Sequence, residues 1–310
     1  MSQSKYHYVF GPVLSRRLGR SLGVDVVPFK ACSYDCAYCQ LGHTTQLSLE
    51  RKDYVPLDAV VAELVQKLNS GIEADHISIA GSGEPTLYSR LGELIAAIKA
   101  ITSIPIAVIT NGSLLWDEQV QTELLEADLI VPNLDAGAEA TFAEINRPPA
   151  GLTLQKMVDG LAGFRQRFTG QIWLEIFLLK GVNDSEAEIG HMVEHVRRIQ
   201  PDRVQLNTLA RPAPGSGLCP VSPETLAGIA GHFEPVAEII AATSAAVSAG
   251  VTAEPQDVLD VLKRHPCTAD DIAAGLQITL EQAAAHLEAL IEQGTIVSES
   301  RAGTTFYIAV

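Results

Sequence analysis

The sequence predicts an α/β protein, a partial (β/α)6, TIM-like barrel followed by a small C-terminal winged-helix domain. Three observations lead to this prediction. Short apolar runs alternate six times with helical patterns within residues 1–245, which we expect to form the barrel. Polar and glycine-containing segments follow the apolar runs, where βα barrels carry their chemistry. Residues 252–310 then change to three helical patterns and two short β runs, which we expect to form the second domain.

The six predicted βα units follow from the spacing of the apolar residues. The predicted strands are the runs 21–27, 76–81, 104–112, 127–136, 171–179 and 203–209. The predicted helices are 56–68, 91–101, 117–126, 153–168, 185–199 and 222–241. Continuous apolar strands between helices indicate a parallel sheet that helices cover. Six units could form a doubly wound sheet or an incomplete barrel. We favour the barrel, because polar segments follow four consecutive strands and would converge at one mouth.

The C-terminal domain is predicted from a change of pattern after the small-residue stretch 241–255. Three helices and two short β runs are typical of a winged helix; the helices are 256–265, 268–276 and 279–294, and the β runs are 295–300 and 304–310. Winged helices often place their third helix in the major groove of DNA, where phosphate contacts need cations.

The charge of this domain argues against that role. Residues 252–310 carry three Lys or Arg and nine acids, a balance of −6. The acids are Glu254, Asp257, Asp260, Asp270, Asp271, Glu281, Glu288, Glu292 and Glu299. The third helix contains no Lys or Arg. We therefore do not expect DNA binding, and we expect a protein- or peptide-docking module, a dimer contact or a lid.

The composition is that of an ordinary globular protein, with 47% hydrophobic and 19% charged residues. The first residues show no signal-peptide pattern and no apolar run has the length of a membrane span, so we expect a cytoplasmic protein without a membrane partner. The formal net charge of −15 disfavours non-specific binding of nucleic acid. Residues 1–52 are locally basic, however, with seven Lys or Arg against three acids.

Three of the five cysteines lie close together in the sequence: Cys32, Cys36 and Cys39 have the spacing C-x3-C-x2-C. This clustering and the odd total do not suit a disulfide framework, and they indicate metal ligands. Three thiolates on a [4Fe–4S] cluster would leave one of its irons with an open position. A Cys3His zinc site with His43 is the main alternative, and buried structural cysteines are another.

The run CSYDCAYCQLG, which contains these cysteines, resembles the signature of the radical S-adenosylmethionine (SAM) superfamily. The resemblance covers about residues 10–210. The run FGPVLSRRLGRSLGVD at 10–25 is similar to a branch of uncharacterised Fe–S oxidoreductases, loosely similar to wyosine-forming tRNA enzymes. The resemblance implies a [4Fe–4S] cluster, with SAM bound at its open iron. It also implies reductive cleavage of SAM to a 5′-deoxyadenosyl radical, with a flavodoxin or ferredoxin as electron donor.

The same resemblance implies residues that contact SAM. The segment GSGEP is similar to a motif that holds the methionyl amine, which assigns Gly81, Ser82, Gly83, Glu84 and Pro85; here Ser82 replaces a common glycine. The aromatic residue between the last two cysteines, Tyr38, would lie beside the adenine. Four polar residues at strand ends or within strands would face the rest of SAM. They are Asn111, Asp135, Glu175 and Asn207.

Several functions stay open. The first is hydrogen abstraction from an unidentified small molecule, peptide or protein. A tRNA-modifying enzyme is the second, and a metal-containing winged-helix regulator is the third. Arg16, Arg17 and Arg20 could clamp an anionic group of the substrate, together with Arg147 and Arg211. Only Cys219 and Cys267 remain, far apart in the sequence, so we do not expect a second cluster.

Overall fold

A computed structural model describes residues 7–209, 217–240, 253–264, 266–301 and 304–310. Within them an eight-stranded sheet has the order β1-β2-β5-β6-β7-β8-β9-β10. These strands are Val9–Ser15, Gly19–Val24, His76–Ile79, Ile106–Thr110, Leu129–Pro132, Gln171–Leu178, Arg203–Thr208 and Glu238–Ile239. From β2 onward all neighbours are parallel, and β1 is antiparallel to β2. The order follows the chain without a switch point, which agrees with the predicted barrel and not with a doubly wound sheet.

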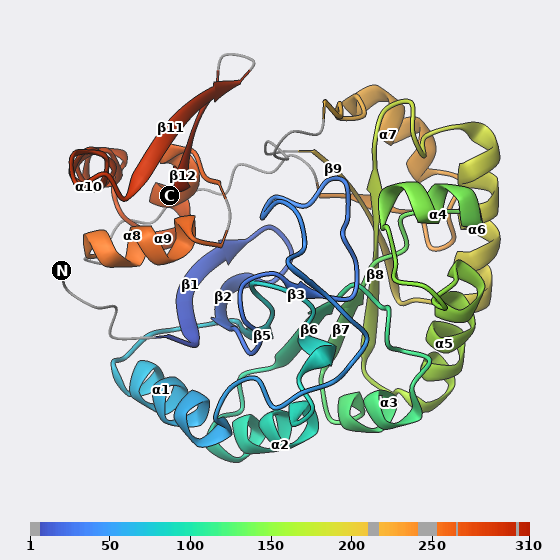
Figure 1. Ribbon diagram of the computed structural model, residues 1–310, viewed down its shortest axis with the longest axis horizontal. Helices are drawn as coiled ribbons and strands as arrows, with labels where there is room; N and C mark the ends of the chain where they lie inside the picture. Colours follow the sequence, from blue (N-terminus) through green and yellow to red (C-terminus); the bar gives the residue numbers. More distant parts are fainter. Residues whose placement is uncertain (1–6, 210–216, 241–252, 265, 302–303) are drawn as a thin grey trace.

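Seven helices of the first 240 residues accompany the sheet within the described part of the chain. They are α1 (Leu57–Asn69), α2 (Leu91–Ile101), α3 (Glu118–Leu124), α4 (Glu139–Ile145), α5 (Leu154–Arg167), α6 (Glu186–Ile199) and α7 (Pro223–Ala230). Figure 1 shows the sheet curving inside an outer arc of helices. Side-chain caps fix several helix starts, since Thr153 and Ser185 each accept a hydrogen bond from the backbone of the first turn.

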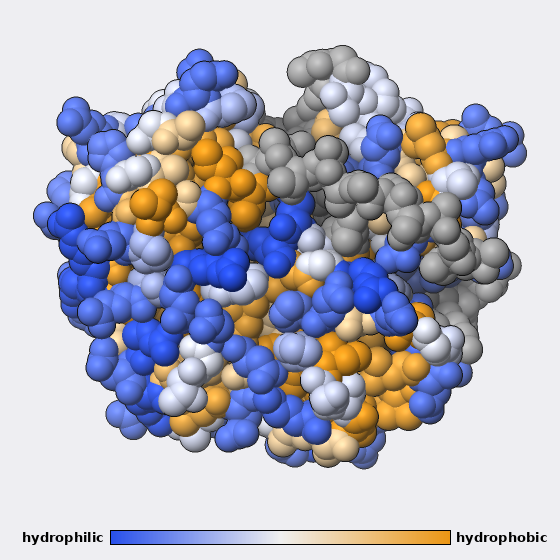
Figure 2. Space-filling model, turned by 180° about the vertical axis from the view of Figure 1, so that it is seen from behind, coloured by the Kyte–Doolittle hydropathy of each residue, from blue (hydrophilic) through white to orange (hydrophobic). Residues whose placement is uncertain are grey.

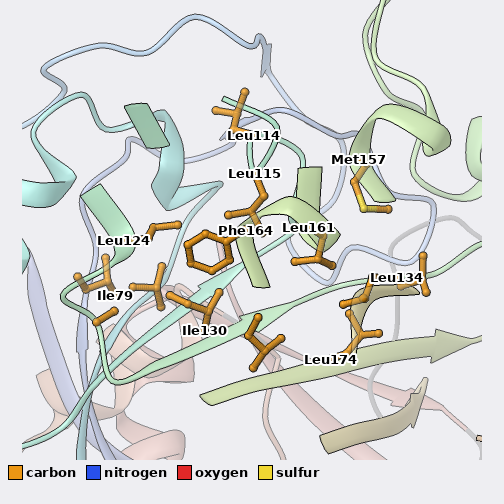
Figure 3. Packing of buried hydrophobic residues seen from close by; sticks show 14 of the residues in the cluster. Ile79, Leu114, Leu115, Leu124, Ile130, Leu134, Met157, Leu161, Phe164 and Leu174 are labelled. Carbon is orange, nitrogen blue, oxygen red and sulfur yellow. The ribbon is translucent and has the colours of Figure 1, made fainter. Parts of the chain in front are cut away.

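The main hydrophobic core fills the space between the sheet and these helices. Phe164 and Leu161 of α5 pack above Ile130 of β7 and Leu174 of β8, and all four are fully buried (Figure 3). A smaller cluster joins Leu18, in the turn between β1 and β2, to Leu129 and other residues of β6 and β7. The first hairpin therefore contributes to the packing of the sheet.

The structure differs from the predicted barrel in four places. The sequence predicted neither β1 nor α4, and it did not predict the short parallel pair β3 (Ala31–Cys32) and β4 (Gln46–Leu47). The predicted helix 222–241 is also wrong over residues 231–240, because the chain turns there and forms β10, and residue 241 lies outside the described residues. Pro235 lies within that stretch and has no backbone N–H to continue a helix.

The C-terminal residues form a second core of their own. Helices α8 (Pro255–Leu262), α9 (Ala269–Leu276) and α10 (Leu280–Glu292) precede an antiparallel hairpin, β11 (Ile296–Arg301) and β12 (Thr304–Ala309). This agrees with the predicted order of three helices and two β runs; the winged-helix assignment itself stays a prediction. The unit packs against β1 through α8 and α9 (Figure 1).

No helix in the described part of the chain is long and apolar enough to cross a membrane. On the face opposite to that of Figure 1, hydrophilic and hydrophobic side chains are interspersed (Figure 2). Large exposed apolar side chains lie in different parts of the chain, among them Phe29 and Val236 in loops and Leu280 in α10.

Replacement of Phe164 by Ala is expected to lower the free energy of unfolding by about 3–5 kcal/mol, because the removed ring leaves a cavity under α5. Urea titration followed by tryptophan fluorescence measures this change, since Trp116 and Trp173 both lie in the barrel. Val236→Ala is the control: this residue belongs to the same unit as Phe164 and is 70% exposed, and its change should stay within about 0.5 kcal/mol. Equal effects of the two substitutions would contradict the described core.

Candidate functional site

The candidate site lies at the carboxyl edge of the sheet, where the segments after β2, β5 and β6 meet. Two backbone hydrogen bonds join the first two segments: Lys30 N donates to Ser82 O (3.0 Å), and Glu84 N donates to Ala31 O (3.1 Å). The segment after β6 joins them through Asn111 N, which donates to the Glu84 carboxylate (2.7 Å). The predicted convergence of these polar segments is confirmed.

The cysteine loop, residues 31–48, is held by its own turns and by the end of α4. Cys39 N donates to Cys36 O (3.1 Å) within the loop, and Ala37 N donates to the carbonyl of Ile145, the last residue of α4 (2.8 Å). All three cysteines of the loop are free and half-buried. The loop therefore presents three thiols from a backbone that is fixed at several points.

Each sulfur of the loop accepts a hydrogen bond from a side-chain nitrogen. The donors are Asn111 Nδ2 to Cys32 Sγ (3.6 Å), Asn146 Nδ2 to Cys36 Sγ (3.6 Å) and Lys30 Nζ to Cys39 Sγ (2.9 Å). Such donors suit sulfurs that carry negative charge, because hydrogen bonds to a charged acceptor are the stronger ones.

Burial opposes ionisation of two of these thiols. It raises the pKa of Cys32 to about 11, and it also raises the pKa of Cys36. Burial therefore favours the neutral thiols in the protein without metal, and a bound metal ion would displace their protons.

Glu84 joins the GSGEP segment to the end of β6. Its buried carboxylate accepts hydrogen bonds from Thr86 N (3.0 Å), the Thr86 hydroxyl (2.5 Å), the Thr110 hydroxyl (2.6 Å) and Asn111 N (2.7 Å). Glu84 also caps the 3-10 turn η1 (Pro85–Leu87). Burial raises the pKa of Glu84, whereas these hydrogen bonds favour its charged form. Within this structure Glu84 is a structural link, and its contact with SAM stays a prediction.

The glycines of the same segment lie where a side chain would not fit. A Cβ atom on Gly83 would overlap the carbonyl oxygen of Ala31, and one on Gly81 would overlap the Asp25 carboxylate at the end of β2. Ser82 donates to the same carboxylate from its hydroxyl (2.6 Å) and its backbone N (3.1 Å). The serine that replaces a common glycine thus connects this segment to β2.

Tyr38 and Asp135 meet in a second polar network. The Tyr38 hydroxyl donates to Asp135 (2.5 Å), and the Tyr38 ring stacks on Phe177 with ring centroids 4.1 Å apart. Asp135 also accepts from Asn146 Nδ2 (2.9 Å) and Phe177 N (3.1 Å). Burial raises the pKa of Asp135, and these donors favour its charged form. Because Asn146 also reaches Cys36, this network extends to the cysteine loop.

Glu175 and Asn207 lie together in a third group. Asn207 Nδ2 donates to Glu175 Oε1 (2.9 Å), and Arg17 from the turn after β1 forms an ion pair with Glu175. Burial lowers the pKa of Arg17 to about 10. A buried carboxylate is costly without a partner, and Arg17 supplies the countercharge here. The expected contacts of Glu175 and Asn207 with SAM stay predictions.

The three N-terminal arginines all have partners on the protein. The partners are Ile240 O for Arg16, Glu175 for Arg17, and Glu73 and Asp75 for Arg20. Arg147 lies 3.9 Å from Asp35, and Arg211 lies outside the described residues. These ion pairs, with the hydrogen bond of Arg16, count against a cationic clamp for an anionic substrate.

The remaining candidate ligands differ in their exposure to solvent. His43, the proposed zinc ligand, is 82% exposed and its Nδ1 lies 3.2 Å from the Asp35 carboxylate, which counts against the zinc alternative. Cys219 is exposed, and Cys267 is buried in the C-terminal core. Among the described residues, no group of three or more His, Cys, Asp or Glu side chains is placed to hold a single metal ion. In a cluster each thiolate binds a different iron, so the sulfurs need not converge on one point.

Sequence reasoning missed three residues of this site. Lys30 was counted only in the local charge of residues 1–52. Asn146 follows a helix that was not predicted, and Asp25 was assigned to the predicted strand 21–27. Position near the cysteines was a signal for Lys30, which precedes Cys32 by two residues. Asn146 gave no such signal, because folding alone brings it to Cys36.

Comparisons with known proteins agree with this geometry. The family model described as "Radical SAM superfamily" matches residues 26–193. The "GTPase Obg" of Brachyspira hyodysenteriae is 40% identical over 99% of this chain, and the chain spans only 46% of that protein. A "UPF0026 protein" of Helicobacter pylori strain J99 is 32% identical over the full length of both chains.

A solved radical SAM methyltransferase from Sphaerobacter thermophilus shares the fold with a TM-score of 0.54. It is 19% identical, and the match covers 71% of this chain and 65% of that one.

Replacement of Gly83 by Ala is expected to lower the unfolding temperature, because the new methyl group would overlap a backbone oxygen and overpacking costs about 1–3 kcal/mol. Thermal unfolding of the metal-free protein measures the effect. Gly190→Ala in α6 is the control, since a Cβ there meets no atom within 4 Å and alanine favours a helix. A Gly83→Ala protein as stable as wild type would contradict the close approach of the two segments.

Proposed function

This chain belongs to the radical SAM superfamily, and we propose that it holds a [4Fe–4S] cluster through Cys32, Cys36 and Cys39 and binds SAM at that cluster. The observation that carries the proposal is the loop of three free cysteines, each with a nitrogen donor at its sulfur. Three thiolates leave one of four irons free for another ligand, and the amino and carboxylate groups of SAM would bind there. The donor set therefore fits this cofactor.

The cofactor would supply the radical chemistry. When bound and reduced by a flavodoxin or ferredoxin, it would supply one electron for cleavage of the C–S bond of SAM to methionine and a 5′-deoxyadenosyl radical, which would remove a hydrogen atom from an unidentified substrate. The protein residues would bind and orient SAM and limit the access of water to it.

Two sets of residues would do this work. Gly81, Ser82, Gly83, Glu84 and Pro85 form the segment beside the cysteine loop, which would receive the methionyl end of SAM. The other proposed contacts are Tyr38, Asn111, Asp135, Glu175 and Asn207. Three hydrogen bonds described above involve them: Tyr38 with Asp135, Asn111 with Cys32, and Asn207 with Glu175. Since Asp135 and Glu175 already accept hydrogen bonds from protein groups, SAM would share these carboxylates with Tyr38, Asn146, Arg17 and Asn207.

The C-terminal unit would have a separate role. We propose that residues 1–245 and 252–310 are separate domains and that the second, a winged-helix domain, docks a protein or peptide. Its excess of acidic residues supports this choice over DNA, whose phosphates repel negative charge.

Replacement of Cys36 by Ala is expected to abolish SAM cleavage, because the cluster would lose one of its three protein ligands. After anaerobic reconstitution, wild-type protein should contain four irons per chain, absorb at about 400 nm and convert SAM to 5′-deoxyadenosine and methionine under reducing conditions. Iron analysis, absorption and chromatography of the products measure these properties.

Cys219→Ala is the matched control, because this exposed cysteine lies outside the loop and its loss should leave cluster and cleavage unchanged. The proposal is wrong if Cys36→Ala protein keeps both the cluster and the cleavage of SAM.

A further inference from the structure

Lys30 is a buried lysine whose ammonium faces a cysteine sulfur. The residue is only 3% exposed, and Nζ lies 2.9 Å from Cys39 Sγ. Among the described residues no carboxylate forms an ion pair with it. A buried ammonium is costly unless a negative charge compensates it, and the partner that the structure gives Lys30 Nζ is Cys39 Sγ.

The backbone holds Lys30 in place. Its N donates to Ser82 O (3.0 Å), and its O accepts from Gln46 N (3.1 Å). Its φ of 58° lies in the left-handed region, which a residue other than glycine keeps only when its surroundings impose it. The side chain therefore starts from a fixed point next to the cysteine loop.

The donors at the three sulfurs differ in charge. Asn111 and Asn146 donate neutral amide hydrogens to Cys32 and Cys36, whereas Cys39 receives a charged donor. Hydrogen bonds to the sulfurs and the net charge around a cluster both set its reduction potential. A fixed cation stabilises the form with the additional electron, so it raises the potential.

We infer that the Lys30 ammonium is the countercharge of the reduced cluster and raises its reduction potential through Cys39. The inference rests on the proposed function, because it requires a cluster on the three cysteines. Lys30 is a positioning residue, and its effect should appear in the cluster alone, before SAM or any substrate is added.

The test is a redox titration of the reconstituted protein, followed by the electron paramagnetic resonance signal of the reduced cluster. Lys30→Met removes the charge at similar length. At a fixed potential it should lower the ratio of reduced to oxidised cluster at least tenfold, which for a one-electron couple is a shift of 59 mV toward more negative potential. Lys30→Arg keeps the charge and should restore a value close to that of wild type.

Two further variants separate charge from other effects. Lys30→Gln keeps an N–H donor without the charge, and its midpoint should also move to more negative potential. Lys52→Met is the matched control, because Lys52 is exposed and pairs with Glu50, and its midpoint should equal that of wild type.

Each outcome of these titrations supports or overturns either the inference about Lys30 or the proposed function. Wild-type midpoints in Lys30→Met and Lys30→Gln proteins with full iron content would overturn the inference and leave the proposed function intact. Loss of the cluster in Lys30→Met but not in Lys30→Arg would support it, whereas equal loss in all three Lys30 variants would overturn it by pointing to a steric role. Wild-type protein that assembles no [4Fe–4S] cluster would instead refute the proposed function.

Discussion

The backbone contact between residues 30–31 and 82–84 is the interaction on which the whole site depends. Two hydrogen bonds and the absence of a side chain at Gly83 let the cysteine loop lie directly against the segment after β5. The same contact fixes Lys30 beside Cys39 and places Glu84 where it can reach β6. Changes in this pairing would therefore displace the sulfurs, their nitrogen donors and the GSGEP segment together.

The site also connects to the rest of the molecule through buried charges. Asp25 accepts hydrogen bonds from Ser82 and forms an ion pair with Arg264 of the C-terminal unit at 3.6 Å. The Arg264 guanidinium also lies over the Phe10 ring at 4.0 Å. Burial raises the pKa of Asp25 and lowers the pKa of Arg264, so each charge depends on the other for compensation. The C-terminal unit is thus in electrostatic contact with the segment beside the cysteines.

Sequence reasoning predicted the parts of this molecule that depend on local patterns. Six of the seven strands that run parallel follow from apolar runs, and the cysteine loop follows from its spacing. It missed β1, whose run VFGPVLS contains a Gly-Pro pair and whose antiparallel partner is β2. It proposed Tyr38 and Asp135 as separate contacts of SAM. It did not predict the hydrogen bond between them, because they are 97 residues apart in the sequence. Partners such as Asn146 for Cys36 arise only from the folded arrangement.

In the proposed site three cysteines hold a cluster whose fourth iron is open to SAM. Mössbauer spectroscopy of protein reconstituted with ⁵⁷Fe detects this iron separately from the other three. Addition of SAM should change the signal of one iron in four and leave the signal of the other three unaltered. A spectrum that does not respond to SAM, or one without a four-iron cluster, would contradict the claim.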